Sequence, residues 1–240
     1  MDVTVAAVIV AAVATLVGAS IQGSIGFGMN LVTVPALALV LPDALPATVI
    51  LIGLPLAVIM FRHEHHALDR DAIGWILAGR VPGTILGAII VAALTADELK
   101  GVIGVFVLFA VAISVFAPPV PMNHPTEFTA GMVAGTTGTA AGIGGPPLAL
   151  LYQHHEGPTM RSTLAASFLF GTLLSIITLS VAHQMHLADL WLALGLSPLV
   201  FAGSRVGRHI TRYVDGRVLR PAVLVFAAVS AIVVIVDALN

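Results

Sequence analysis

Apolar tracts about 20 residues long recur along the whole chain and are separated by short polar segments. A tract of this length crosses the hydrocarbon core of a bilayer as a helix, which pairs its own backbone polar groups. Of the 240 residues, 58% are hydrophobic and 9% charged, whereas soluble proteins average about 25% charged residues. The sequence therefore predicts an all-α, polytopic integral membrane protein whose outer surface contacts the lipid bilayer. No separate soluble domain is predicted.

Ten helical segments are predicted from the alternation of apolar tracts and polar breaks. Because short segments can enter and leave the membrane on one side, we expect about eight transmembrane helices, within a range of seven to ten. The first tract follows no Lys or Arg and is expected to be a retained span. The predicted segments are residues 3–22, 30–41, 46–61, 72–94, 99–117, 128–140, 146–153, 162–181, 188–206 and 218–236.

The two tryptophans, Trp75 and Trp191, lie 116 residues apart, and several other residues recur at this offset. We therefore expect one membrane domain made of two copies, residues 1–116 and 117–240, with the second repeat unit ending at residue 232. Chance coincidence of Gly and Ala is the alternative. The paired residues are Gly26 and Gly142, Gly28 and Gly144, Gly79 and Gly195, Pro82 and Pro198, Gly87 and Gly203, Thr95 and Thr211, and Ser114 and Ser230.

The distribution of arginine predicts that the two copies have opposite orientations. Arg62 and Arg70 precede the Trp75 helix, whereas in the second copy the loop before the Trp191 helix has no Lys or Arg and five arginines, from Arg205 to Arg220, follow that helix. Cytoplasmic loops accumulate Lys and Arg, so equivalent loops face opposite sides, as in an inverted-topology repeat. Both termini are then extracytoplasmic; a parallel repeat with an uneven charge bias is the alternative. The arginines of the second copy are Arg161, Arg205, Arg208, Arg212, Arg217 and Arg220.

Each copy contains a glycine-rich break where a helix is expected to continue: residues 20–37 and residues 136–151, the latter with "GTAAGIGGPPLALL". Non-helical backbone inside the membrane is tolerated only where it lines a cavity or is buried in protein. Pro146 and Pro147 suit the first turn of a new helix, and Asn30 suits the N-cap of its counterpart. We expect discontinuous or re-entrant half-helices whose N-termini attract an anion; close helix packing by small residues is the alternative.

Arg80 lies several residues inside the helix predicted at 72–94, and its repeat equivalent is Leu196. A cation at that depth either meets a transported anion or snorkels to the membrane edge. With the two breaks, it defines a predicted substrate-binding set. These residues are Gln22, Ser24, Gly26, Phe27, Gly28, Met29, Asn30, Arg80, Thr136, Thr137, Gly142, Ile143, Gly144, Gly145 and Pro146.

The segments "AGIGGPPLALL" and "IGFGMNLVTVPAL", together with the two-copy layout, resemble the sulfite exporter TauE/SafE family. The resemblance implies a transporter of the bacterial plasma (inner) membrane that exports sulfite, sulfonates or related small sulfur-containing anions. It also implies that the glycine motifs flank the substrate site. Met29 and Asn30 depart from the family pattern, which often continues with further glycines. The matching residues are Gly26, Gly28, Pro35, Gly142, Gly144, Gly145 and Pro146.

Histidines raise an alternative, a metal-ion permease that uses His63, His65 and His66 or the pair His154 and His155. A non-transporting membrane scaffold or assembly factor is a second alternative. The sequence has no cysteine and no hydrolase or metalloprotease motif, so we expect no catalytic residue, metal site or cofactor. The expected partners are a small anion and a coupling ion, such as a proton. A homo-oligomer is compatible with the sequence, and the charge balance argues against nucleic-acid binding.

Overall fold

The computed structural model describes residues 4–118, 120–153, 155–210 and 216–239, which contain ten α-helices and no strand. All ten predicted helical segments are present. Their bounds are α1 (Val5–Ile25), α2 (Met29–Val40), α3 (Ala47–Glu64), α4 (Arg70–Ala93), α5 (Ala96–Phe116), α6 (His124–Ala141), α7 (Gly145–Leu151), α8 (Gly157–Val181), α9 (Leu187–Ile210) and α10 (Gly216–Ala238), with short 3-10 turns at Pro42–Ala44 and His65–Ala67.

Seven helices of the described residues are long and apolar enough to cross a membrane: α1, α3, α4, α5, α8, α9 and α10. Helices α2 and α7 have 12 and seven residues and are too short to span the bilayer alone. Large apolar side chains such as Ile89 and Ile177 are exposed on the outside of the bundle, where lipid would cover them. The all-α, polytopic membrane architecture is therefore confirmed.

Polar caps set the helix starts at the two ends of the bundle. The Asp69 carboxylate accepts a hydrogen bond from the Ala72 amide and begins α4, and Thr95 with Glu98 forms a capping box at the start of α5. Asn123 caps α6 in the same way, so this helix begins at His124, four residues before the predicted start. Apolar periodicity alone does not reveal such polar first turns.

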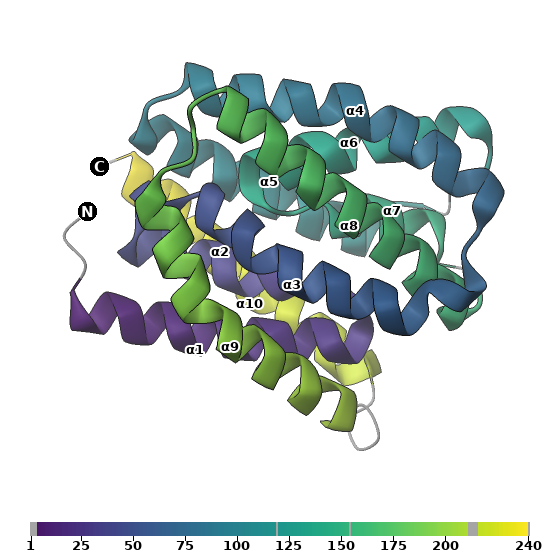
Figure 1. The fold of residues 1–240 in the computed structure, drawn as a ribbon, viewed down its shortest axis with the longest axis horizontal. Helices are drawn as coiled ribbons and strands as arrows, with labels where there is room; N and C mark the ends of the chain where they lie inside the picture. The colour runs from purple at the N-terminus through teal and green to yellow at the C-terminus, as the bar shows by residue number, and fades with distance from the viewer. Residues whose placement is uncertain (1–3, 119, 154, 211–215, 240) are drawn as a thin grey trace.

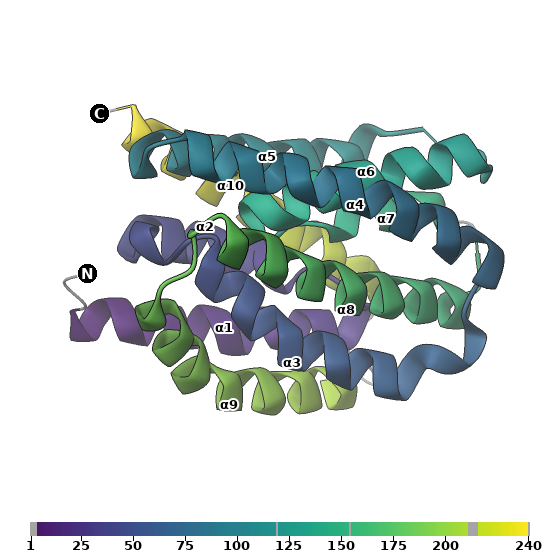
Figure 2. The ribbon, with the colours of Figure 1, turned by 45° about the horizontal axis from the view of Figure 1, so that its top comes forward.

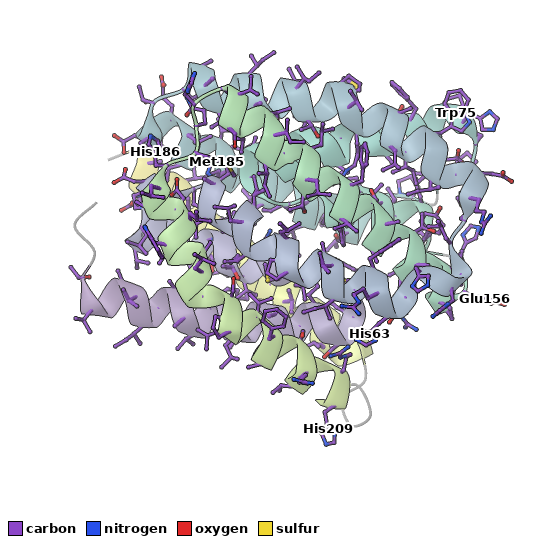
Figure 3. All side chains as sticks on the ribbon, in the orientation of Figure 1. His63, Trp75, Glu156, Met185, His186 and His209 are labelled. Atoms are coloured by element: carbon purple, nitrogen blue, oxygen red, sulfur yellow. The ribbon has the colours of Figure 1, made fainter. Side chains whose placement is uncertain are left out.

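The two tryptophan-bearing helices run in opposite directions. Helix α4 begins at the end of the bundle that carries Trp75, here called the Trp75 end, whereas α9 begins at the opposite end, the His186 end (Figures 1 and 3). Helix α1 begins and α10 ends at the His186 end (Figure 1). This arrangement is what an inverted repeat requires, although the division at residue 116 stays a prediction.

Helices of the two predicted copies pack across each other rather than within separate halves (Figure 2). Helix α4 packs on α6, and the equivalent pair under the offset of 116, α9 and α1, also packs together. Both contacts are backbone to backbone, because a Cβ added at Gly79 would collide with the Phe128 carbonyl and one at Gly203 would lie 2.5 Å from the Leu16 carbonyl. Each pair therefore joins one helix from either half.

Candidate functional site

The first break separates α1 from α2 and is held by one side chain. Gly26 ends α1 at φ 89°, and Gly28 precedes α2 at φ 110°, both in the left-handed region that favours glycine. The Gly26 amide donates to the Gln22 carbonyl at 2.9 Å, and the Met29 amide donates to Gln22 Oε1 at 3.0 Å. Gln22 therefore stabilises both the end of α1 and the start of α2.

The second break separates α6 from α7 and is held by a hydroxyl. Gly142 ends α6 at φ 70°. The Ile143 amide donates to the Thr137 carbonyl at 3.1 Å, and the Thr137 hydroxyl donates to the Ile143 carbonyl at 2.7 Å. Pro146 and Pro147 occupy the first turn of α7, where a missing amide hydrogen leaves no helix bond unmade, as predicted.

The two breaks lie against each other. Asn30 Nδ2, in the first turn of α2, donates to the Gly142 carbonyl at 2.6 Å. A Cβ at Gly142 would lie 3.0 Å from the same nitrogen and 2.9 Å from Val49 Cγ2, so glycine is required there by both space and torsion. Asn30 Oδ1 is buried and has no hydrogen-bond partner in the described residues. One Asn30 acceptor therefore remains for a ligand or water.

Arg80 points into the protein and does not snorkel to the membrane edge. Its exposed fraction is 4%. Nη1 donates to the Ser167 carbonyl and Nη2 donates to the Ala134 carbonyl at 3.3 Å, while Nε has no partner in the described residues. A Cβ at Gly144 would lie 2.6 Å from Nη2, and one at Gly171 would collide with the guanidinium. Glycines thus create the space that the buried cation occupies.

A central cavity lies between the two breaks, with Arg80 on its wall. The volume that the centres of water molecules can occupy is about 80 Å³, enough for several waters or one small ion. Among the described residues that line the cavity, Arg80 is the one ionisable side chain, so the cavity favours an anion. Eleven predicted site residues line it: Gln22, Phe27, Gly28, Met29, Asn30, Arg80, Gly142, Ile143, Gly144, Gly145 and Pro146.

The other four predicted residues lie outside this lining. The Ser24 hydroxyl bonds the Gly207 carbonyl at 2.8 Å and joins α1 to α9, whereas the Thr136 hydroxyl bonds the Met132 carbonyl at 3.0 Å within α6. Thr137 closes the second break, and Gly26 lines a neighbouring cavity. These residues support the breaks and helix contacts instead of facing the central cavity.

Helix α8 supplies cavity residues that the sequence analysis did not select. Phe168, Gly171, Thr172 and Ser175 line the cavity at spacings of three and four residues, which places them on one helix face. A stripe of small and hydroxyl residues in an otherwise apolar helix was the signal available for finding them. Helix α3 adds Gly53 and Ala57, and the remaining lining residues are Leu31, Val49, Ile50 and Gly138.

Comparison with known protein families matches residues 10–234 to the family described as Sulfite exporter TauE/SafE. The chain belongs to this family. TauE/SafE proteins are membrane transporters of sulfur-containing anions, which agrees with a cavity that the positive Arg80 lines. No curated protein and no solved structure matches the chain. The resemblance predicted from the two glycine motifs is confirmed, and it covers nearly the whole TauE/SafE chain.

The histidines of this TauE/SafE protein form no metal-binding cluster in the described residues, where no three His, Cys, Asp or Glu side chains are grouped for a metal ion. His63, His65 and His66 are exposed at the Trp75 end, and the His65 ring bonds the Phe61 carbonyl. His155 packs against Tyr152, and His154 lies outside the described residues. No observation therefore favours the metal-ion permease.

Proposed function

We propose that the protein is a secondary transporter that exports a small sulfur-containing anion, sulfite or an organosulfonate, by alternating access. The observation that carries this proposal is the buried Arg80 in the central cavity. A buried cation without a counter-ion costs several kcal/mol. Arg80 bonds only carbonyl oxygens and has no ion-pair partner in the described residues, so a bound anion would supply the missing negative charge.

The chemistry of an oxyanion fits the groups around the cavity. A sulfite or sulfonate group presents several acceptor oxygens on one sulfur, and a guanidinium offers a planar set of donors that binds such oxygens in pairs. Arg80 Nε has no present partner in the described residues, so it can donate to such an oxygen. Gly53 and Ala57 of α3 contribute small side chains to the cavity lining, which leaves room for a short organic group.

We assign the Trp75 end to the cytoplasm on the basis of charge. Arg62, Arg70, Arg161, Arg205 and Arg208 lie in helix ends at this end of the bundle, whereas Lys100 lies at the His186 end (Figure 1). Both termini are then extracytoplasmic, in the plasma (inner) membrane of a prokaryote. Cysteine substitutions at Ala67 and Thr95 test the assignment, since an impermeant maleimide applied to intact cells should label Thr95→Cys alone.

Flux in proteoliposomes tests the function. Reconstituted protein should carry labelled sulfite or an organosulfonate, and Arg80→Gln should abolish the flux because it removes the one charge of the cavity. Arg62→Gln is the matched control, since Arg62 is exposed at the Trp75 end and should retain activity. Absence of anion flux from correctly folded protein would contradict the transporter proposal and favour the scaffold, which predicts a co-purifying partner. A proton gradient applied across the same liposomes tests proton coupling.

A further inference from the structure

A second cavity lies beside the central one, toward the Trp75 end, and its lining is charged. Arg161, Arg208, Glu64 and His63 line it, together with Gln22 and Met60. The volume open to water centres is about 40 Å³, room for a few water molecules. This cavity contains none of the glycines of the second break, so it is a separate space from the central cavity.

The charges of the second cavity do not cancel. Arg161 Nε lies 3.2 Å from Glu64 Oε2, and both side chains are partly exposed. Arg208 has no ion-pair partner among the described residues. Two arginines face one carboxylate in this lining, and the excess positive charge attracts anions from solution. An arriving anion would compete with Glu64 for the guanidinium of Arg161.

Gln22 lines both cavities, so its side chain lies where the two spaces adjoin. Its Nε2 donates to Met60 Sδ at 3.3 Å, while its Oε1 holds the Met29 amide of the first break. A thioether is a weak acceptor, so the Met60 contact opens at little cost. Arg161 lies across the same break, because a Cβ at Gly26 would lie 3.2 Å from Arg161 Cγ.

We propose that Arg161 and Arg208 form a second anion-binding site, which takes the oxyanion group of the transported substrate at the Trp75 end before it passes Gln22 into the central cavity. This inference rests on the proposed function. Glu64 acts as an internal competitor that occupies Arg161 when no anion is bound. If the arginines served only as topology determinants, positive charge anywhere at this end of the bundle would be enough. Such a role would not require that both arginines line a cavity next to the central cavity.

Substrate kinetics from the two faces test the second site. In inverted membrane vesicles the Trp75 end faces the medium, and there Arg161→Gln and Arg208→Gln should each raise KM for sulfite about twofold to fivefold, the size expected for an exposed ion pair. The maximal rate should stay unchanged, because Arg80 and the central cavity are intact. Raising the salt concentration should reduce the difference, since salt screens exposed charges.

Glu64→Gln separates a binding role from a structural one. Removal of the competing carboxylate should lower KM for sulfite, whereas Arg161→Gln should raise it. If the ion pair were purely structural, replacing either partner would impair transport in the same way. Arg161→Lys should keep KM near that of the wild type and covers the case in which Arg161→Gln folds poorly. Arg62→Gln is the control and should leave KM unchanged.

The outcomes distinguish this inference from the proposed function. Wild-type flux that Arg80→Gln abolishes, with KM unaffected by Arg161→Gln and Arg208→Gln, would overturn the second site and keep the transporter. An equal KM effect in right-side-out vesicles would also overturn it, because the site would then not belong to one face. Loss of all wild-type anion flux would instead contradict the proposed function itself.

Discussion

The two glycine breaks have similar backbones but different chemistry. The first is held by Gln22 and continues with Met29 and Asn30, whereas the second is held by Thr137 and continues with Gly145 and Pro146. The first therefore brings polar side chains to the central cavity. The second brings backbone and the apolar side chains of Ile143 and Pro146, and Gly144 leaves space for a guanidinium from α4.

This difference shows how a repeated scaffold can carry a one-sided site. Arg80 occupies the second break's side of the cavity, and the residue at the equivalent position, Leu196, is buried and apolar. Two copies would give two cations and a doubly charged empty cavity, at a higher desolvation cost. With one cation, Arg80, and the side-chain amide of Asn30, the site is suited to a single small anion. The anion would then meet a different group on the side of each of the two breaks.

The largest effect is expected from the charge itself. Arg80→Gln should reduce sulfite flux by ~100-fold or more, consistent with the 2–5 kcal/mol typical of a lost buried charge contact. Leu196→Met replaces one apolar side chain with another at the position equivalent to Arg80, and it should leave flux near the wild-type level. Flux assays on equal amounts of folded protein check both; equal losses from both variants would show that the copies contribute alike.

The glycine beside Arg80 should come next. Gly171→Ala would place a Cβ on the guanidinium, which must then leave its present position, and we expect flux to fall about 10-fold to 100-fold. Gly53→Ala is the matched control at another glycine of the cavity lining, because its Cβ would meet nothing within 4 Å. If Gly171→Ala transports normally, the position of Arg80 is not critical for binding.

The paired glycines of the tryptophan-bearing helices should differ in stability. A Cβ at Gly79 would meet the Phe128 backbone, so Gly79→Ala should destabilise the fold by about 1–3 kcal/mol. A Cβ at Gly195 has open space, and Gly195→Ala should stabilise its helix by up to about 1 kcal/mol. Thermal unfolding in detergent measures both changes. Similar shifts would mean that the offset of 116 pairs these positions in packing as well as in sequence.

Much of this fold could be predicted because glycine, proline and apolar length act locally. The breaks at Gly26 and Gly142 were predicted from composition, and both adopt left-handed torsions. The direction of Arg80 could not be predicted, since it depends on whether Gly144 of the second break and Gly171 of α8 leave space beside it. The same holds for Phe168 and Ser175, whose exposure to the cavity is decided by tertiary packing of α8 and not by its own sequence.

The smallest effect is expected at the contacts that close each break. Asn30→Ala removes the bond that joins the two breaks and leaves the Gly142 carbonyl without this donor, at a cost of about 1–3 kcal/mol. Thr137→Val removes the hydroxyl that bonds the Ile143 carbonyl in the second break and the Val133 carbonyl in α6, and it keeps the side-chain volume. Because Asn30 also lines the cavity, its loss should lower flux severalfold and raise KM, whereas Thr137→Val should lower thermal stability and leave KM unchanged. If the two variants give the same KM, Asn30 is a structural link between the breaks and not a substrate contact, and selectivity must then come from Arg80.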